Sequence, residues 1–393
     1  MKIKLRFIGY LVNCVFIILT MTTVYHVNHS EQTSLIAGLF LVTDLLYILF
    51  VTKKMKLKHS YVLFLFIYVI VAFMYCILKN NNHISCFNVL FLSNLGYFLF
   101  IYLLKQSNEE LIFFKILIRI AFWIALVSIF CWIFVTKLEV FKPTGVVYLQ
   151  WGKGTYISSF FNIYYMPQYG RNSAIFAEGP AANYFFFSML LLNEFYIGYR
   201  LKLYNTVFII AIITTLTTTG QIGLILFLSY KLMGMKGEKK VFFAIKSIGI
   251  IIGAVGGLLI LKTIFEGKLE TGSGIIRLNM MRREIVAFIR NPILGEGFCA
   301  YTEGSSNSIT SLLADGGIVL WGMYYGPQIF LLMKEFLLRR KINWFVLIYM
   351  CIFAVSVFHF TILSGVFWAI FWNMILLEGK RGRIKNEYLY HNA

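Results

Sequence analysis

Apolar windows long enough to cross a bilayer recur along this chain and leave little room for a soluble fold. A membrane-spanning helix needs roughly 20 apolar residues. Because 59% of the residues are apolar and only 13% are charged, a soluble protein of this length could not bury its apolar surface. We therefore predict one integral membrane domain, residues 1–393, with an all-α polytopic fold and about twelve transmembrane helices. The predicted spans are 7–25, 33–51, 60–78, 84–104, 112–135, 180–199, 205–217, 220–234, 241–262, 309–333, 342–358 and 361–378.

Lysine and arginine residues gather in alternate gaps between these windows, and this pattern predicts the orientation. Clear examples are the stretches 2–6, 53–58 and 380–385. Because basic loops stay on the cytoplasmic side, both termini are predicted to be cytoplasmic in a multi-pass protein of the cytoplasmic (inner) membrane. The net charge of +19 comes from these short clusters and not from one continuous basic stripe. No nucleic-acid partner is therefore expected.

Two gaps predicted to face outward are much longer than ordinary connections between helices: 136–179 and 263–308. Long loops on a compact scaffold tend to carry function. The first loop ends with Arg171 to Glu178, directly before a helix predicted to begin near Pro180, since proline is favoured in a first turn. The amides and the dipole of such a helix end favour an anion.

The second loop carries four arginines on the side of the membrane where the positive-inside rule disfavours them: Arg277, Arg282, Arg283 and Arg290. A guanidinium binds phosphate oxygens with a bidentate fork, so a lipid diphosphate is the predicted ligand. One continuous helix would not place the first three on one face. Arg277 is therefore the first candidate for the phosphate contact and Arg282 the second, whereas the others are headgroup contacts or solvated.

Several of these elements resemble the motifs of the O-antigen polymerase and ligase superfamily. The elements are Gly274-Ile-Ile-Arg277, Asn291-Pro-Ile-Leu-Gly295-Glu-Gly297, and the passage from Asn307 to Asp315-Gly-Gly. Arg171 to Glu178 resembles the earlier outward motif of that superfamily, and Thr217-Thr-Thr-Gly220 resembles its polar interruption between two short helices. The likeness extends from Arg171 to about Met333.

The chain departs from the family pattern at two positions, and one of them distinguishes the polymerase branch from the ligase branch. Met281 stands where the family commonly has a tryptophan, and Ser306 stands where the ligase branch has a histidine. The missing histidine favours the polymerase branch. The resemblance thus implies a metal-independent glycosyltransferase of GT-C-like architecture that needs no cofactor. Its substrates would be undecaprenyl diphosphate-linked glycans, as donor and as acceptor, for O-antigen, capsule or exopolysaccharide. Membrane lipid and a chain-length regulator protein are the other implied partners.

The resemblance also suggests roles for single residues. Arg171 and Arg277 would stabilise the leaving diphosphate, and Glu178 would act as the general base, with Asp315 as the weaker candidate. Neither long loop contains an Asp-x-Asp pair, so no metal ligands are predicted. The predicted substrate contacts are Arg282, Arg283, Asn291, Gly295, Gly297, Asn307 and Asp315.

Three other functions remain open at this point. A flippase or transporter of lipid-linked oligosaccharides would also have about twelve helices, but it should carry its cations inside the helices, along a cavity. The ligase branch is the second alternative, and a membrane scaffold without enzymatic activity is the third.

Overall fold

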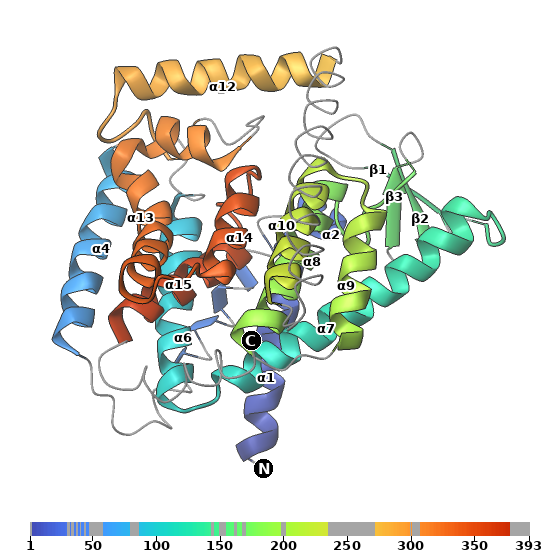
Figure 1. Ribbon diagram of the computed structural model, residues 1–393, viewed down its shortest axis with the longest axis horizontal. Coiled ribbons are helices and arrows are strands. Elements are labelled where there is room, and N and C mark those ends of the chain that lie inside the picture. Colours follow the sequence, from blue (N-terminus) through green and yellow to red (C-terminus); the bar gives the residue numbers. More distant parts are fainter. Residues whose placement is uncertain are drawn as a thin grey trace, which may run out of the picture.

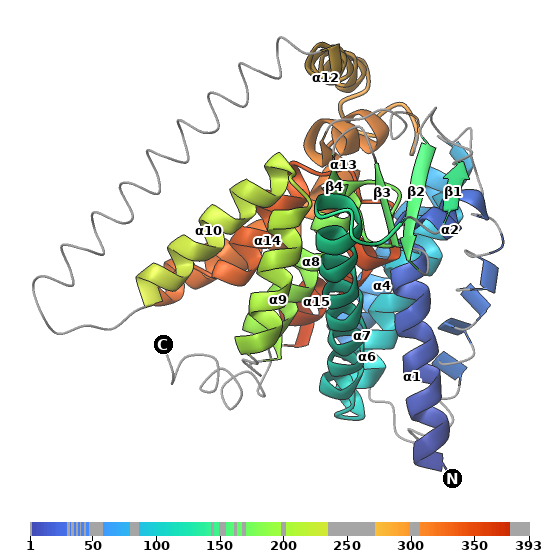
Figure 2. The ribbon, with the colours of Figure 1, turned by 90° about the vertical axis from the view of Figure 1, so that its right-hand side faces the viewer.

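A computed structural model describes residues 2–29, isolated positions between 32 and 46, 58–78, 86–142, 145–148, 155–160, 163–166, 170–197, 202–234, 272–298, 300 and 307–377. The fold is mostly helical, as predicted. The helices form a bundle with the N-terminus at one end, and helix α12 lies across the opposite end (Figure 1). A quarter turn of the molecule shows α12 end-on (Figure 2), so this helix runs across the others.

The first half of the chain contributes helices and a small sheet. The elements are α1 (Lys2–Leu19), α2 (Val24–Asn28), α4 (His59–Leu78), η1 (Asn88–Gly96), α6 (Tyr97–Gln106), α7 (Glu110–Cys131), η2 (Trp132–Lys137), β1 (Gly145–Tyr148), β2 (Thr155–Phe160), β3 (Ile163–Met166), β4 (Arg171–Asn172), α8 (Gly179–Leu191) and η3 (Leu192–Tyr196). The segments η1, η2 and η3 are π-helical and continue neighbouring α-helices without a break.

The second half is helical wherever it has regular structure in the described residues. Its elements are α9 (Lys202–Thr214), α10 (Thr218–Gly234), α12 (Gly272–Arg290), α13 (Ser308–Arg339), α14 (Trp344–Ala354) and α15 (Ile362–Leu377). Helix α13 bends at Gly317, whose φ of 60° and ψ of −160° are not helical. The bend lies within the Asp315-Gly-Gly passage.

Three helical stretches in the described part of the chain are long and apolar enough to cross a membrane: His59–Ile77, Asn88–Gln106 and Glu110–Lys137. Shorter apolar helices are Phe7–Leu19, Lys202–Thr214, Trp344–Ala354 and Ile362–Leu377. The predicted window 241–262 lies outside the described residues, as does most of 33–51. The total of twelve spans therefore stays a prediction.

The first long loop contains a four-stranded antiparallel sheet that we did not predict. Its strand order is β1-β2-β3-β4. Gly145 pairs with Ser158 in the first ladder, and Met166 pairs with Arg171 in the last. The sheet thus ends on the strand that carries Arg171.

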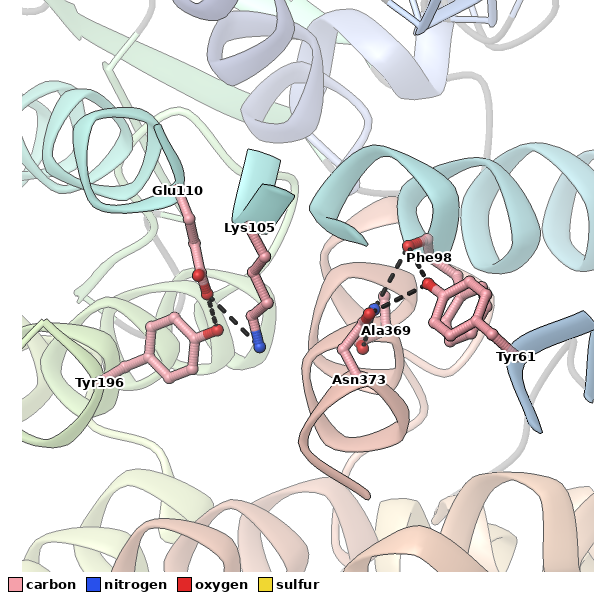
Figure 3. A network of polar contacts seen from close by, with 7 residues as sticks. All are labelled: Tyr61, Phe98, Lys105, Glu110, Tyr196, Ala369 and Asn373. Atoms are coloured by element: carbon pink, nitrogen blue, oxygen red, sulfur yellow. Dashed lines mark hydrogen bonds and ion pairs between the residues drawn. The ribbon is translucent and has the colours of Figure 1, made fainter. Parts of the chain in front are cut away.

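Polar contacts join helix ends around the α6–α7 turn, which lies at the same end of the bundle as the N-terminus (Figure 3). The Tyr61 hydroxyl donates to Asn373 Oδ1 at 3.0 Å. Glu110 accepts a hydrogen bond from the Tyr196 hydroxyl and lies 3.6 Å from Lys105 Nζ. These bonds tie together helices that are distant in sequence and leave the opposite end, under α12, for the candidate site.

Candidate functional site

The segment from Gly170 to Glu178 is held by side-chain bonds to two helices. Asn172 Nδ2 donates to Ser128 Oγ at 3.1 Å and to Thr214 Oγ1 at 3.0 Å. Its Oδ1 accepts from the Ala174 amide at 2.9 Å. Every polar atom of this buried amide side chain therefore has a partner, and the bonds fix the segment against α7 and α9.

Backbone bonds hold the other side of the same segment. The Ala177 amide donates to Thr22 O at 2.9 Å, and the Val24 amide donates to Ile175 O at 3.1 Å. The turn between α1 and α2 thus pairs with the segment like a short strand. Arg171 and Glu178, which flank the paired residues, are placed by a backbone that is bonded on both sides.

Arg171 lies beside the N-terminus of α8. A Cβ atom at Gly179, the first residue of that helix, would be 3.8 Å from Arg171 Cδ, 3.2 Å from Thr215 O and 3.3 Å from Thr217 Cγ2. Gly179 therefore lets the helix end approach the turn between α9 and α10. The predicted polar interruption at Thr217 to Gly220 is confirmed as this break between two helices.

Glu178 is the residue that precedes α8, and its side chain makes no hydrogen bond to the helix. The predicted helix start near Pro180 is confirmed, because α8 begins at Gly179. Burial raises the pKa of the Glu178 carboxyl above its ordinary value of 4.5, and the positive charge of Arg277 opposes this rise. Arg277 of α12 thus acts on a carboxylate in the other long loop.

Glu284 lies on the face of α12 that packs on the bundle, and sequence reasoning missed it. Its side chain is 1% exposed and accepts a hydrogen bond from the Thr310 hydroxyl. Thr310 is in turn held by Asn307, whose Oδ1 accepts from the Thr310 amide at 2.9 Å and whose Nδ2 donates to Thr310 Oγ1 at 2.8 Å. Glu284 and Arg277 are two turns apart and share one face of α12. The available signal was that Glu284 is the one acid between Gly272 and Arg290.

The loop after α12 is bonded to the bend in α13. The Glu296 amide donates to Ala314 O at 2.8 Å, and the Gly297 amide donates to Asp315 O at 3.0 Å. In return, the Ile318 amide donates to Pro292 O at 2.9 Å. These bonds occupy backbone groups that the bend removes from the helix, so the loop and the bend stabilise each other.

Glycines make this close approach sterically feasible. A Cβ at Gly295 would lie 2.5 Å from the Asp315 carbonyl carbon, and one at Gly317 would lie 2.4 Å from Ile293 O. Gly295 and Gly317 both have positive φ, 65° and 60°. The structure therefore gives Gly295 a packing role, in addition to the substrate contact that we predicted.

The remaining predicted residues occupy different places. Arg282 and Arg283 are exposed, on faces of α12 other than that of Arg277. Asp315 is fully buried at the bend, and Asn291 Nδ2 donates to Glu296 Oε1 at 3.3 Å. The structure thus brings together Arg171, Glu178 and Arg277, whereas the other predicted contacts shape or surround the α12–α13 connection. Ser306 lies outside the described residues.

Asn183, about one turn into α8, is a second polar residue that sequence reasoning missed. It is fully buried, and neither polar atom of its side chain has a hydrogen-bond partner in the described part of the molecule. Its Oδ1 is 2.7 Å from the point where Gly220 would carry a Cβ. An unpaired amide therefore lies against the α9–α10 turn, close to the start of α8.

Comparison with family models, with curated proteins and with solved structures finds no match for this chain. The resemblance to the O-antigen polymerase and ligase superfamily stays a prediction.

Proposed function

We propose that this protein is a membrane glycosyltransferase, a polymerase that joins undecaprenyl diphosphate-linked repeat units at the outer face of the cytoplasmic membrane. One observation carries the proposal: Arg277 from the second long loop acts electrostatically on Glu178 from the first. Arg171 lies beside the same helix end as Glu178. Glu178 and Arg171 thus lie at one helix N-terminus, a position that favours anions, and Arg277 of the other loop contributes positive charge to it.

In the proposed reaction, the growing chain on one polyprenyl diphosphate is the donor and a hydroxyl of a second lipid-linked unit is the acceptor. The acceptor oxygen attacks the anomeric carbon, and the bond from that carbon to the diphosphate oxygen breaks. The hydroxyl proton passes to Glu178. Negative charge develops on the leaving diphosphate, where Arg277 and Arg171 stabilise it in the transition state. Membrane anchoring of both substrates supplies further rate by holding them in register.

The raised pKa of Glu178 suits this role. A general base is most effective when its pKa approaches the working pH, and burial moves the Glu178 carboxyl in that direction. Arg277 limits the rise, so the carboxylate stays available while the same guanidinium faces the site. The proposed active site thus uses one arginine for two purposes.

The test is the length of the surface polysaccharide in cells whose only copy carries a substitution. Arg277→Ala and Arg171→Ala should each leave single repeat units in place of long chains. Arg277→Lys should restore less than the full length, because an ammonium lacks the bidentate fork. Lys202→Ala is the matched control: it removes a positive charge at the exposed first residue of α9 and should leave the chains long.

Three results would contradict the proposal. Long chains in both arginine variants, at normal protein levels in the membrane, would remove the phosphate-binding role. Complete loss of surface repeat units would indicate a transporter. Accumulation of long chains that stay on the polyprenyl lipid would indicate a ligase.

A further inference from the structure

Helix α12 presents three different faces, about a third of a turn apart, because successive residues are offset by roughly 100°. The inward face carries Met281, Glu284 and Phe288 and packs on α13. Glu284, in the middle of this face, is 1% exposed and bonded to Thr310. The bond fixes the rotation of the helix about its own axis, so the other two faces are fixed as well.

One outer face is apolar. It carries Leu278, Ile285 and Ile289, and the last two are 41% and 68% exposed. Ile293, 64% exposed, lies in the loop that follows the helix. Rows of exposed isoleucine are unfavourable in water and mark surfaces that another apolar phase covers.

The other outer face is cationic. Its charged residues are Arg283 and Arg290, Asn279 is exposed beside them, and the exposed Ile276 and Val286 share this face, whereas Arg282 lies at the edge between the two faces. The one acid of α12, Glu284, is buried on the inward face. Every exposed charge on this helix is therefore positive, and the surface is complementary to an anion.

The position of α12 explains this combination. The helix lies across the end of the bundle, whereas the spans α4, α6 and α7 run between the ends (Figures 1 and 2). A helix so placed is parallel to the bilayer at the level where the spans leave it. An apolar face next to a row of cations is the pattern of helices that lie in the interface of an anionic membrane.

We propose that the two outer faces of α12 bind the lipid surface of the membrane. The row Ile285–Ile289 contacts the boundary between acyl chains and headgroups, and Arg282, Arg283 and Arg290 bind the phosphates of anionic lipids. This contact is separate from the proposed glycosyl transfer, which uses Arg277, a residue on the same face of α12 as Glu284. A second copy of the chain fits less well, because it would bring two sets of arginines together.

The test uses the full-length protein in nanodiscs, with a tryptophan placed on α12. In Ile289→Trp the added fluorescence should be blue-shifted and quenched by lipids brominated close to the headgroup. Asn279→Trp, on the cationic face, is the matched control and should be quenched less. The signal is the difference from the parent protein, which has seven tryptophans of its own. Ile285→Trp, at another exposed position, repeats the measurement if the first variant is unstable.

Charge is tested in the Ile289→Trp background. Nanodiscs with phosphatidylglycerol should give stronger quenching than nanodiscs with phosphatidylcholine alone, and Arg283→Gln with Arg290→Gln should abolish the difference. Unquenched tryptophan at both 285 and 289 would overturn the proposal. So would quenching that is equal in the two lipids, or a blue shift without quenching that grows with protein concentration, which would indicate a second copy.

Discussion

The contact between the bend of α13 and the loop after α12 can be tested by one added methyl group, in Gly317→Ala. Gly317 has φ of 60° and ψ of −160°, a region that only glycine adopts readily, and another residue there costs about 1–3 kcal/mol. The new Cβ would also lie 2.4 Å from the carbonyl carbon and oxygen of Ile293 and 2.7 Å from Leu294 N. These are backbone atoms and cannot rotate away.

Relief of that overlap requires the loop to move, and overpacking of this kind costs about 1–3 kcal/mol. The two costs together predict a loss of about 2–6 kcal/mol of unfolding free energy. The measurement is the thermal midpoint of the purified protein in nanodiscs at one fixed scan rate, because membrane proteins of this size unfold irreversibly. We expect the midpoint of Gly317→Ala to fall by several degrees.

Gly322→Ala is the control on the same helix. A Cβ at Gly322 would meet no atom within 4 Å, and alanine favours a helix over glycine by about 0.5–1 kcal/mol. The thermal midpoint of this variant should stay the same or rise slightly. Equal midpoints for Gly317→Ala and Gly322→Ala would refute the steric argument for the bend.

Three further experiments test the candidate site. Because the pKa of Glu178 is raised on folding, ionisation of this carboxyl lowers stability as the pH rises from its unfolded-state pKa through its folded-state pKa. Glu178→Gln should therefore raise the thermal midpoint at neutral pH. At pH values below both pKa values, the substitution should leave the midpoint unchanged. In a double-mutant cycle of Glu284→Ala and Thr310→Val, followed by the same thermal midpoints, the double variant should fall by less than the sum of the two single variants, and additive falls would mean that their hydrogen bond does not hold α12. Asn183→Leu should not lower the midpoint, since the buried amide has no hydrogen bond to lose in the described structure; a fall like that of Gly317→Ala would contradict this.

Features that depend only on neighbouring residues in the chain could be predicted from the sequence. Pro180 predicted the start of α8 because proline fits the first turn of a helix, and α8 begins one residue earlier. The spacing of Arg277, Arg282 and Arg283 predicted that one continuous helix would not place them on one face. The three do lie on different faces of α12. These predictions needed only the residues within a turn or two of each position.

Contacts between distant segments could not be predicted in the same way. The buried role of Glu284 depends on Thr310, in another helix, and nothing near Glu284 in the sequence indicates that partner. The strands β1 to β3 contain the β-branched and aromatic residues typical of strands. They are short, however, and they lie in a gap that we predicted to be a loop. Gly295 and the Asp315-Gly-Gly passage were noted as family motifs, but the contact of Gly295 with Asp315 was not predicted.

The geometry of α12 links the two proposals. Arg277 shares the face of Glu284, and Arg283 and Arg290 lie on another face of the same helix, so no rotation of α12 can alter one set without altering the other. The rotation is fixed by the Glu284–Thr310 bond, and the end of the helix is fixed by the loop bonded to the bend at Gly317. Lipid binding on the outer faces would therefore act through a rigid helix on the position of Arg277. Consequently, a change at the bend should disturb both the proposed catalysis and the proposed lipid contact.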